Sequence, residues 1–114
     1  MTKKLLFLIM IASALASVST AHASVAQAGT VYQITTTDTG VVYFWQRGTR
    51  NAQPACGASF PGRWAFNATT PAGQSMLALL MSANASGKSV VVAGKSACDV
   101  AGDTESVSYI YIAD

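Results

Sequence analysis

The chain has 114 residues, of which 51% are hydrophobic and only 11% are charged, and its formal net charge is +2. This length suits a single domain, so a multidomain enzyme is excluded. The low charge content also excludes a disordered acidic or basic tail and a domain that coats nucleic acid.

The first 23 residues have the layout of a secretory signal peptide. Lys3 and Lys4 are followed by an apolar run from Leu5 to Ala16 and by the small-residue motif A-H-A at 21–23. The apolar run is about 12 residues long, whereas a helix that spans a bilayer needs about 20. We therefore predict cleavage rather than an uncleaved membrane anchor, and we expect no membrane span in the mature chain.

Removal of residues 1–23 changes the charge of the predicted domain, 24–114. Two of the seven basic residues leave, so five basic and five acidic residues balance. Without a dense basic patch, the domain is not expected to bind nucleic acid. His22, the only histidine, leaves as well, which excludes His-dependent triads and His-ligated zinc.

Three strands are predicted in the first half of the domain. Residues 30–37 (TVYQITTT) and 41–47 (VVYFWQR) are rich in β-branched and aromatic residues and flank a turn that contains glycine, so they form a hairpin. Residues 48–62 are rich in Gly, Asn, Gln and Pro, which predicts a surface loop, and this loop carries Cys56. Residues 63–67 (RWAFN) form a short third strand.

A helix is predicted from Ala72 to Ser86. Thr69 or Thr70 is a suitable N-cap, Pro71 is tolerated in the first turn, and Gly87 follows the last turn. Its apolar residues cover an arc of about 200°, wider than the stripe of about 100° that one core requires. The helix is therefore expected to lie in a cleft between core elements or to pack against another chain. The predicted oligomer interface consists of Met76, Leu79, Leu80 and Ala83.

Two more strands complete the pattern. Residues 88–93 (KSVVVA) contain three consecutive valines, which suggests burial on both faces, and residues 94–102 form a loop that carries Cys98. Residues 106–112 (SVSYIYI) are the last strand. Most aromatic side chains, including Phe44, Phe66 and Tyr109, are expected to lie in the core.

Cys56 and Cys98 are the only cysteines in the chain. Export to an oxidising compartment makes a disulfide the expected state. On the chain-entropy model, a loop of this length stabilises the fold by about 4 kcal/mol. The alternatives are a reactive thiol and a soft metal site, which two sulfurs without a histidine support less well.

The predicted fold is mainly β with one helix, in the order β-β-β-α-β-β. This is the order of the OB-fold, a small five-stranded Greek-key barrel in which the helix lies between the third and fourth strands. A generic α+β sandwich with the same order of elements is the alternative.

The groups available for catalysis are few. After loss of the histidine, acid–base chemistry depends on the carboxylates Asp38, Asp99, Asp103, Glu105 and Asp114. Three of these cluster as D-x-x-x-D-x-E, a spacing that does not match an EF-hand, so a solvated acidic loop is favoured over a calcium site. No nucleophile elbow or phosphate-binding loop is present. We therefore predict a protein that is not an enzyme and that has no metal and no cofactor.

The aromatic residues indicate a binding function instead. In the predicted strand 41–47, one face carries Tyr43 and Trp45, and polar side chains follow directly. Aromatic rings can stack on a sugar ring while polar groups bind its hydroxyls, and the OB barrel face is a platform for oligosaccharides and oligonucleotides. Since the domain has no net positive charge, an oligosaccharide is favoured. The predicted ligand-binding residues are Tyr43, Trp45, Arg47, Arg50, Asn51 and Trp64.

The second half of the chain resembles a family of bacterial toxin subunits. A helix from Gln74 to Ser86, the strand start G-K-S-V at 87–90 and a cysteine in the next loop occur together in a short exported chain. This pattern, over roughly residues 60–112, is similar to the B subunits of pertussis-like and subtilase-type toxins. The resemblance implies an OB-fold, a pentameric ring with the helices lining its centre, binding of sialylated or related glycans, and a catalytic partner subunit. No glycan-binding motif of the family matches, so no binding residue is transferred.

The sequence thus predicts a secreted or periplasmic, disulfide-bridged module that recognises a glycan and forms rings. A second hypothesis is a periplasmic structural or inhibitory protein. Such a protein would bind a protein partner through a strand edge or through the loop 48–62.

Overall fold

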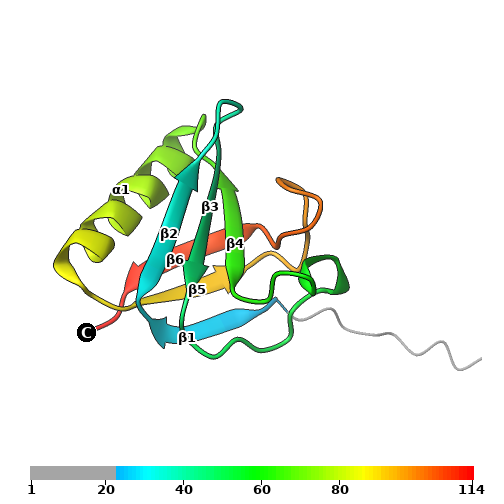
Figure 1. Cartoon of the computed structure of the whole chain (residues 1–114), viewed down its shortest axis with the longest axis horizontal. Coiled ribbons are helices and arrows are strands. Elements are labelled where there is room, and N and C mark those ends of the chain that lie inside the picture. Colours follow the sequence, from blue (N-terminus) through cyan, green and yellow to red (C-terminus); the bar gives the residue numbers. More distant parts are fainter. Residues whose placement is uncertain (1–22) are drawn as a thin grey trace, which may run out of the picture.

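The computed structural model describes residues 23–114, so the predicted signal peptide, except for Ala23, lies outside the described residues. The elements in chain order are β1 (Val25–Gly29), β2 (Val31–Thr36), β3 (Val41–Gln46), the short 3-10 helix η1 (Ala55–Gly57), β4 (Arg63–Asn67), α1 (Pro71–Ser86), β5 (Val90–Gly94) and β6 (Val107–Ile112) (Figure 1). No helix in this part of the chain has the length and apolar character needed to cross a bilayer.

Residues 23–114 form two three-stranded antiparallel sheets, with the strand orders β1-β5-β6 and β2-β3-β4. The predicted class, mainly β with one helix, is confirmed, and the five predicted strands and the helix lie close to their expected bounds. The sequence does not predict β1, because VAQAG contains a single β-branched residue. This strand pairs with the valine-rich β5, where Ala26 lies opposite Val92.

The predicted closed five-stranded barrel is wrong, because the hydrogen-bonded strands form two separate sheets. Between the sheets there are isolated bridges at Ala26–Arg50, which is antiparallel, and at Ala65–Ser106, which is parallel. The chain passes from one sheet to the other at Thr30, the single residue between β1 and β2. Within the sheet β2-β3-β4, the β2–β3 register shifts between Tyr32 and Thr35, and Gln33 has a φ of 51°. Such a bulge bends a strand locally, and the β2–β3 pairing resumes at Thr35.

The ends of α1 confirm the predicted helix signals. The Thr70 hydroxyl accepts a hydrogen bond from the Gly73 N–H at 3.0 Å, and Pro71 occupies the first turn. Gly87 ends the helix with a φ of 66°, a left-handed conformation that favours glycine. A Cβ at Gly73 would lie 1.8 Å from the Asn67 carbonyl oxygen, so glycine lets the helix start close to the end of β4.

Most of the wide apolar arc of α1 packs against other elements of the same chain. The helix packs against both β6 and β2, which belong to different sheets. Leu80 and Ala83 are fully buried, and Met76 and Leu79 are partly buried against the core. Leu80 and Ala83 therefore have no surface left for contact with a second copy, whereas Met81 remains 54% exposed.

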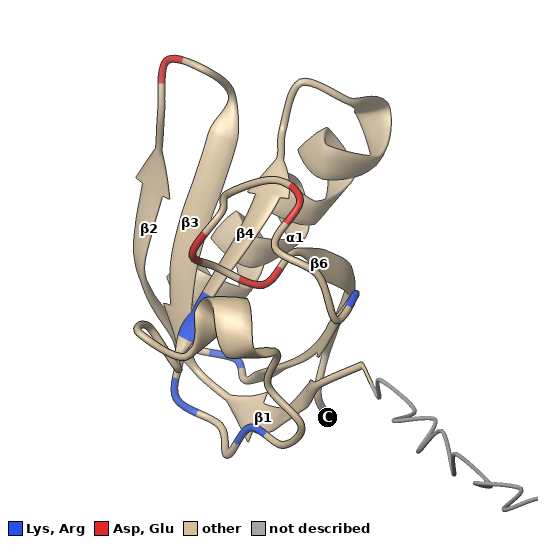
Figure 2. Cartoon of the chain, turned by 90° about the vertical axis from the view of Figure 1, so that its right-hand side faces the viewer, with Lys and Arg blue, Asp and Glu red and all other residues tan. Residues whose placement is uncertain are grey.

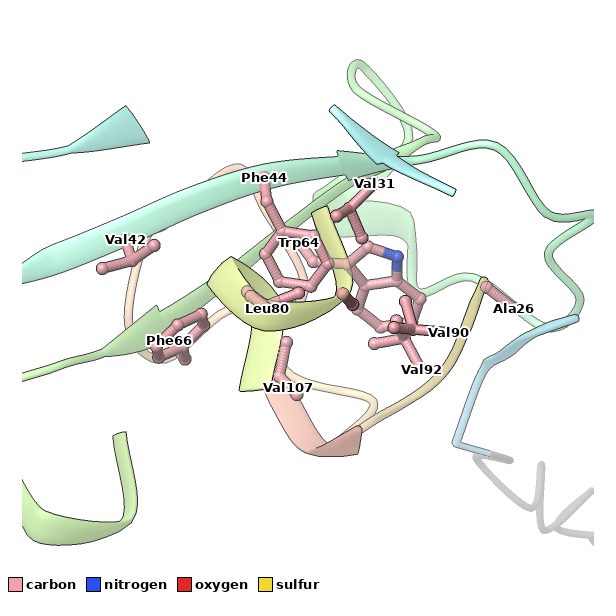
Figure 3. Close-up of a cluster of buried hydrophobic side chains, with 11 residues drawn as sticks. Ala26, Val31, Val42, Phe44, Trp64, Phe66, Leu80, Val90, Val92 and Val107 are labelled. Carbon is pink, nitrogen blue, oxygen red and sulfur yellow. The ribbon is translucent and has the colours of Figure 1, made fainter. Parts of the chain in front are cut away.

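The core lies between the two sheets and α1 (Figure 3). Its largest fully buried side chains are Trp64, Phe44 and Leu80, each with no exposed surface. The predicted burial of Phe44 and Phe66 is confirmed, and their rings meet edge to face with centroids 6.1 Å apart.

Tyr109, predicted to lie in the core, is 54% exposed. The β5–β6 register shifts between Ala93 and Gly94, so Val107 lies inside while Tyr109 and Tyr111 lie outside. The two tyrosine rings stack with centroids 6.4 Å apart. Val91 pairs with the exposed Tyr111 and is only partly buried, so the prediction that β5 is buried on both faces is wrong.

The predicted disulfide between Cys56 and Cys98 is present, with a Cα–Cα distance of 6.2 Å. It joins the loop between β3 and β4 to the loop between β5 and β6.

Candidate functional site

The outer face of the sheet β2-β3-β4 carries four aromatic side chains, which we call the aromatic face: Tyr32, Tyr43, Trp45 and Phe60. Alternate residues of β3 point to opposite sides, so Val42 and Phe44 enter the core while Tyr43 and Trp45 face outward. Cross-strand pairing places Trp45 between Tyr32 of β2 and Arg63 of β4. Phe60 joins them from the turn before β4.

Trp45 is at the centre of this face. Its ring stacks with Tyr32 at a centroid distance of 6.2 Å and an interplanar angle of 29°. On the other side, Phe60 meets it edge to face at 6.3 Å and 79°. Both arrangements are favoured by the aromatic quadrupole. All four rings are partly buried, so the face keeps some aromatic surface open to solvent.

Two guanidinium groups flank the aromatic face. The Arg47 Cζ lies 4.1 Å from the Tyr32 ring centroid, and its Nη1 donates to the Thr30 hydroxyl at 3.1 Å. The Arg63 Cζ lies 3.7 Å from the Phe60 centroid and 4.9 Å from that of Tyr43. These are cation–π distances, so each guanidinium lies over the face of a neighbouring ring, and within residues 23–114 Trp45 is the aromatic residue of this face with no guanidinium over its ring.

Arg63 is also held from the loop between β5 and β6. Its Nη2 donates to Asp103 Oδ1 at 2.8 Å and its Nε donates to the Thr104 hydroxyl at 2.8 Å. The hydrogen bond from Thr104 is the largest effect on the pKa of the Asp103 carboxyl, and together with Arg63 it holds that pKa below its ordinary value. Asp103 therefore faces Arg63 as a carboxylate at neutral pH.

A second arginine, Arg50, forms a buried ion pair with Glu105 at 2.8 Å, with side-chain exposures of 6% and 0%. The Ser24 hydroxyl donates to Glu105 Oε1 at 2.5 Å, and the Ser96 N–H donates to Oε2 at 3.1 Å. The Arg50 Cζ lies 3.6 Å from the Trp64 ring centroid. Burial lowers the pKa of Arg50, while its hydrogen bond to Glu105 opposes this effect. Because both side chains are buried and hydrogen-bonded to one another, this pair is a structural feature of the interior.

The structure divides the predicted ligand-binding residues. Tyr43, Trp45 and Arg47 come together on or beside the aromatic face, whereas Arg50 and Trp64 lie in the interior. Asn51 is exposed, but its Oδ1 accepts a hydrogen bond from the Val25 N–H at 2.9 Å and so ties the loop to β1.

Sequence reasoning missed three members of this site: Tyr32, Phe60 and Arg63. Tyr32 lies in a predicted strand, and its place opposite Trp45 follows from the hairpin register. Phe60 lies in a predicted loop, where no periodicity indicates its direction. Arg63 directly precedes Trp64 on a strand, so the alternation of faces predicts that one points outward when the other is buried.

The three clustered carboxylates are each engaged by protein groups. Asp103 pairs with Arg63 and Glu105 with Arg50, while Asp99 accepts from the Ser106 hydroxyl. Hydrogen bonding from Ser106 is also the largest cause that lowers the pKa of Asp99. Within residues 23–114, no group of three or more His, Cys, Asp or Glu side chains is arranged to hold a metal ion.

A pocket of about 170 Å³ lies elsewhere, beside the first turns of α1. It is lined by Phe66, Asn67, Thr70, Ala72, Gly73, Met76, Lys95, Val100 and Val107. None of the predicted ligand-binding residues lines it.

No protein-family model, curated protein or solved structure matches the chain. The resemblance to toxin B subunits therefore stays an expectation drawn from the sequence pattern.

Proposed function

We propose that this chain is an exported, disulfide-bridged binding module that recognises a glycan through the aromatic face. The observation that carries the proposal is Trp45, flanked by the rings of Tyr32 and Phe60 on the outer side of a sheet. The apolar face of a sugar ring stacks on such aromatic surface, and nearby guanidinium groups donate hydrogen bonds to its hydroxyls. The guanidinium groups that would bind the sugar hydroxyls are those of Arg47 and Arg63.

The proposal includes an OB-like relationship of the strands. β1 and β2 are separated only by Thr30. β1 pairs with β5, and β2 pairs with β3. Counted as one interrupted strand, β1 and β2 leave five strands with the helix between the third and the fourth. The parallel bridge at Ala65–Ser106 and the bridge at Ala26–Arg50 then mark an open version of the barrel. In the OB-fold, the face of strands two and three binds oligosaccharides and oligonucleotides, and β3 and β4 hold these places here.

The charges favour a glycan over nucleic acid. Binding to a phosphate backbone depends on several Lys or Arg residues that release counterions. Here two guanidiniums flank the aromatic face, and Asp103 compensates one of them. A ligand with many hydroxyls and little charge therefore suits this surface better than a polyanion.

The test is a glycan array followed by titration calorimetry on the best ligand, with Trp45→Ala compared with the unmodified protein. We expect Trp45→Ala to weaken binding at least tenfold, because a central aromatic residue contributes about 2 kcal/mol or more. Tyr111→Ser is the matched control, since Tyr111 is an exposed aromatic residue of the other sheet. The proposal is rejected when the unmodified protein binds no glycan, or when both variants bind like it.

Export and assembly are further parts of the proposal. The Cys56–Cys98 disulfide suits an oxidising compartment, secreted or periplasmic. Several copies in a ring would present several weak binding sites at once and so raise the avidity for a glycan-bearing surface. A catalytic partner subunit would be carried by such a ring. Light scattering after size exclusion tests the ring, and a monomer at micromolar concentration would remove it from the proposal.

A protein partner is the second candidate function, and the sheet β1-β5-β6 favours it. Its three strands contain no Asp, Glu, Lys or Arg, and its edge strand β6 exposes Tyr109 and Tyr111. Uncharged edge strands are prone to pair with another chain. A pull-down distinguishes the two functions. Recovery of one stoichiometric protein that is lost in Tyr109→Ser but kept in Trp45→Ala would support the protein partner.

A further inference from the structure

The two arginines beside the aromatic face differ in how their charges are compensated. Arg63 forms a salt bridge to Asp103. Arg47 forms none with any residue between 23 and 114, and its hydrogen-bond partner is the neutral hydroxyl of Thr30. The face therefore has one neutralised guanidinium and one that keeps its positive charge.

Asp103, Thr104 and Arg63 form a closed set of hydrogen bonds. The Thr104 hydroxyl accepts from Arg63 Nε at 2.8 Å and donates to Asp103 Oδ1 at 3.0 Å, and Asp103 Oδ1 also accepts from Arg63 Nη2 at 2.8 Å. Thr104 is fully buried, so the hydroxyl at the centre of the set is fixed. These bonds hold the guanidinium across the Phe60 ring, 3.7 Å from its centroid.

The loop that supplies Asp103 is itself anchored near this position. Cys98 is disulfide-bonded to the loop between β3 and β4, and Glu105 is part of the buried ion pair with Arg50. In Figure 2 the acidic positions of this loop lie in front of the sheet β2-β3-β4, near the basic start of β4. Asp103 therefore reaches the aromatic face from a segment about 40 residues further along the chain, held in place before any ligand binds.

We propose that Asp103 is a positioning residue that sets the ligand specificity of the aromatic face. It holds Arg63 over the Phe60 ring and compensates its charge, so that Arg47 is the one uncompensated cation of the face. The favoured ligand is a sugar that is neutral or carries a single anionic group, and polyanionic glycans are selected against. This inference rests on the proposed function and deepens it, because it names the class of glycan.

The test compares Asp103→Asn with Asp38→Asn, which changes the net charge equally. Asp38 lies in the β2–β3 turn, at the opposite end of the hairpin from Trp45. The measurement is quenching of tryptophan fluorescence by iodide, an anion, and by acrylamide, which is neutral. Trp64 is fully buried, so collisional quenching reports on Trp45.

In Asp103→Asn, a second uncompensated cation attracts iodide to the face. We expect the iodide quenching constant to rise about two-fold at low salt, while the acrylamide constant stays unchanged. In Asp103→Glu and in Asp38→Asn, we expect the iodide quenching constant to equal that of the unmodified protein. On a dextran sulfate column, Asp103→Asn elutes at higher salt than the unmodified protein and Asp38→Asn.

Equal iodide constants in the two Asn variants overturn the proposal, because Asp103 then does not set the charge of the face. A parallel rise with iodide and acrylamide also overturns it, since the loop would then merely cover Trp45. Neither probe is a glycan, so a failed glycan array leaves this test of Asp103 intact, and a failed quenching test leaves glycan binding intact.

Discussion

Replacing Glu105 by glutamine tests whether the buried ion pair stabilises the fold. The two carboxylate oxygens accept from three donors: the Ser24 hydroxyl, the Arg50 guanidinium and the Ser96 N–H. Glutamine has a similar shape but offers one acceptor oxygen, and its amide group turns a donor toward one of these donors. The variant also leaves the Arg50 side chain, only 6% exposed, without a counter-charge.

These losses give an expected magnitude. A lost hydrogen bond to a charged group costs about 1.5–3 kcal/mol, and leaving one charge of a buried pair uncompensated costs about 3–5 kcal/mol in total. We expect Glu105→Gln to lower the free energy of unfolding by about 3 kcal/mol, the lower end, because glutamine keeps part of the hydrogen bonding. For a domain of this size, that corresponds to a fall in the melting temperature of about 15 °C.

The assay is urea unfolding followed by circular dichroism, with the slope of the transition as a check on two-state behaviour. Arg50→Met and the double variant Arg50→Met/Glu105→Gln complete a double-mutant cycle. The double variant should cost clearly less than the sum of the two single variants, because it leaves no charge buried alone. A loss below about 1 kcal/mol in Glu105→Gln, or strict additivity, would refute the account of a desolvated pair.

Three further predictions concern the frame around the site. Replacing both cysteines by serine should lower the free energy of unfolding by about 2–5 kcal/mol in urea denaturation, because the cross-link between two loops is lost; an unchanged midpoint would contradict this. Gly73→Ala should destabilise the protein by about 1–3 kcal/mol, since its Cβ would meet the Asn67 carbonyl oxygen, whereas Gly102→Ala, with nothing within 4 Å, serves as the control in the same thermal melts. Folding lowers the pKa values of Asp99 and Asp103 below the ordinary value of 3.8. Their contribution to stability is therefore fully present above pH 3.8, and it is lost as the pH falls through the lower pKa values of the folded state. Acid titration followed by circular dichroism should show this loss, and replacing both residues by asparagine should weaken it.

Local patterns predicted most of the elements but not how distant segments pair. The caps Thr70 and Gly87 and the alternation along β3 act within a few residues, and the structure has both features. β1 forms because a valine-rich strand lies beside it, a long-range effect that the composition of VAQAG does not show. Closure of the barrel depends on how many residues pair between strands distant in sequence, and within residues 23–114 the two sheets pair only at the isolated bridges Ala65–Ser106 and Ala26–Arg50.

The errors at the candidate site have a related cause. Arg50 lies in a polar loop and was expected at the surface, but Glu105, 55 residues away, provides a buried partner for it. The sequence predicts Trp64 as a ligand-binding residue because tryptophan is rarely fully buried and often keeps one edge open to water. Its actual direction follows from register: Arg63 lies opposite Trp45 on the outer face, so the next residue of the strand points inward.

Arg63 and Trp64 show how the fold and the candidate site depend on one another. They are consecutive in β4 and point to opposite sides, Arg63 toward the aromatic face and Trp64 into the core. Both residues are linked to the loop between β5 and β6 through an ion pair. Arg63 forms one with Asp103 of that loop. Trp64 lies under the guanidinium of Arg50, which forms the other with Glu105. Because Asp103 and Glu105 are two residues apart, the buried pair fixes the loop that positions the exposed one. The interior ion pair is therefore part of the reason that the aromatic face has a defined charge.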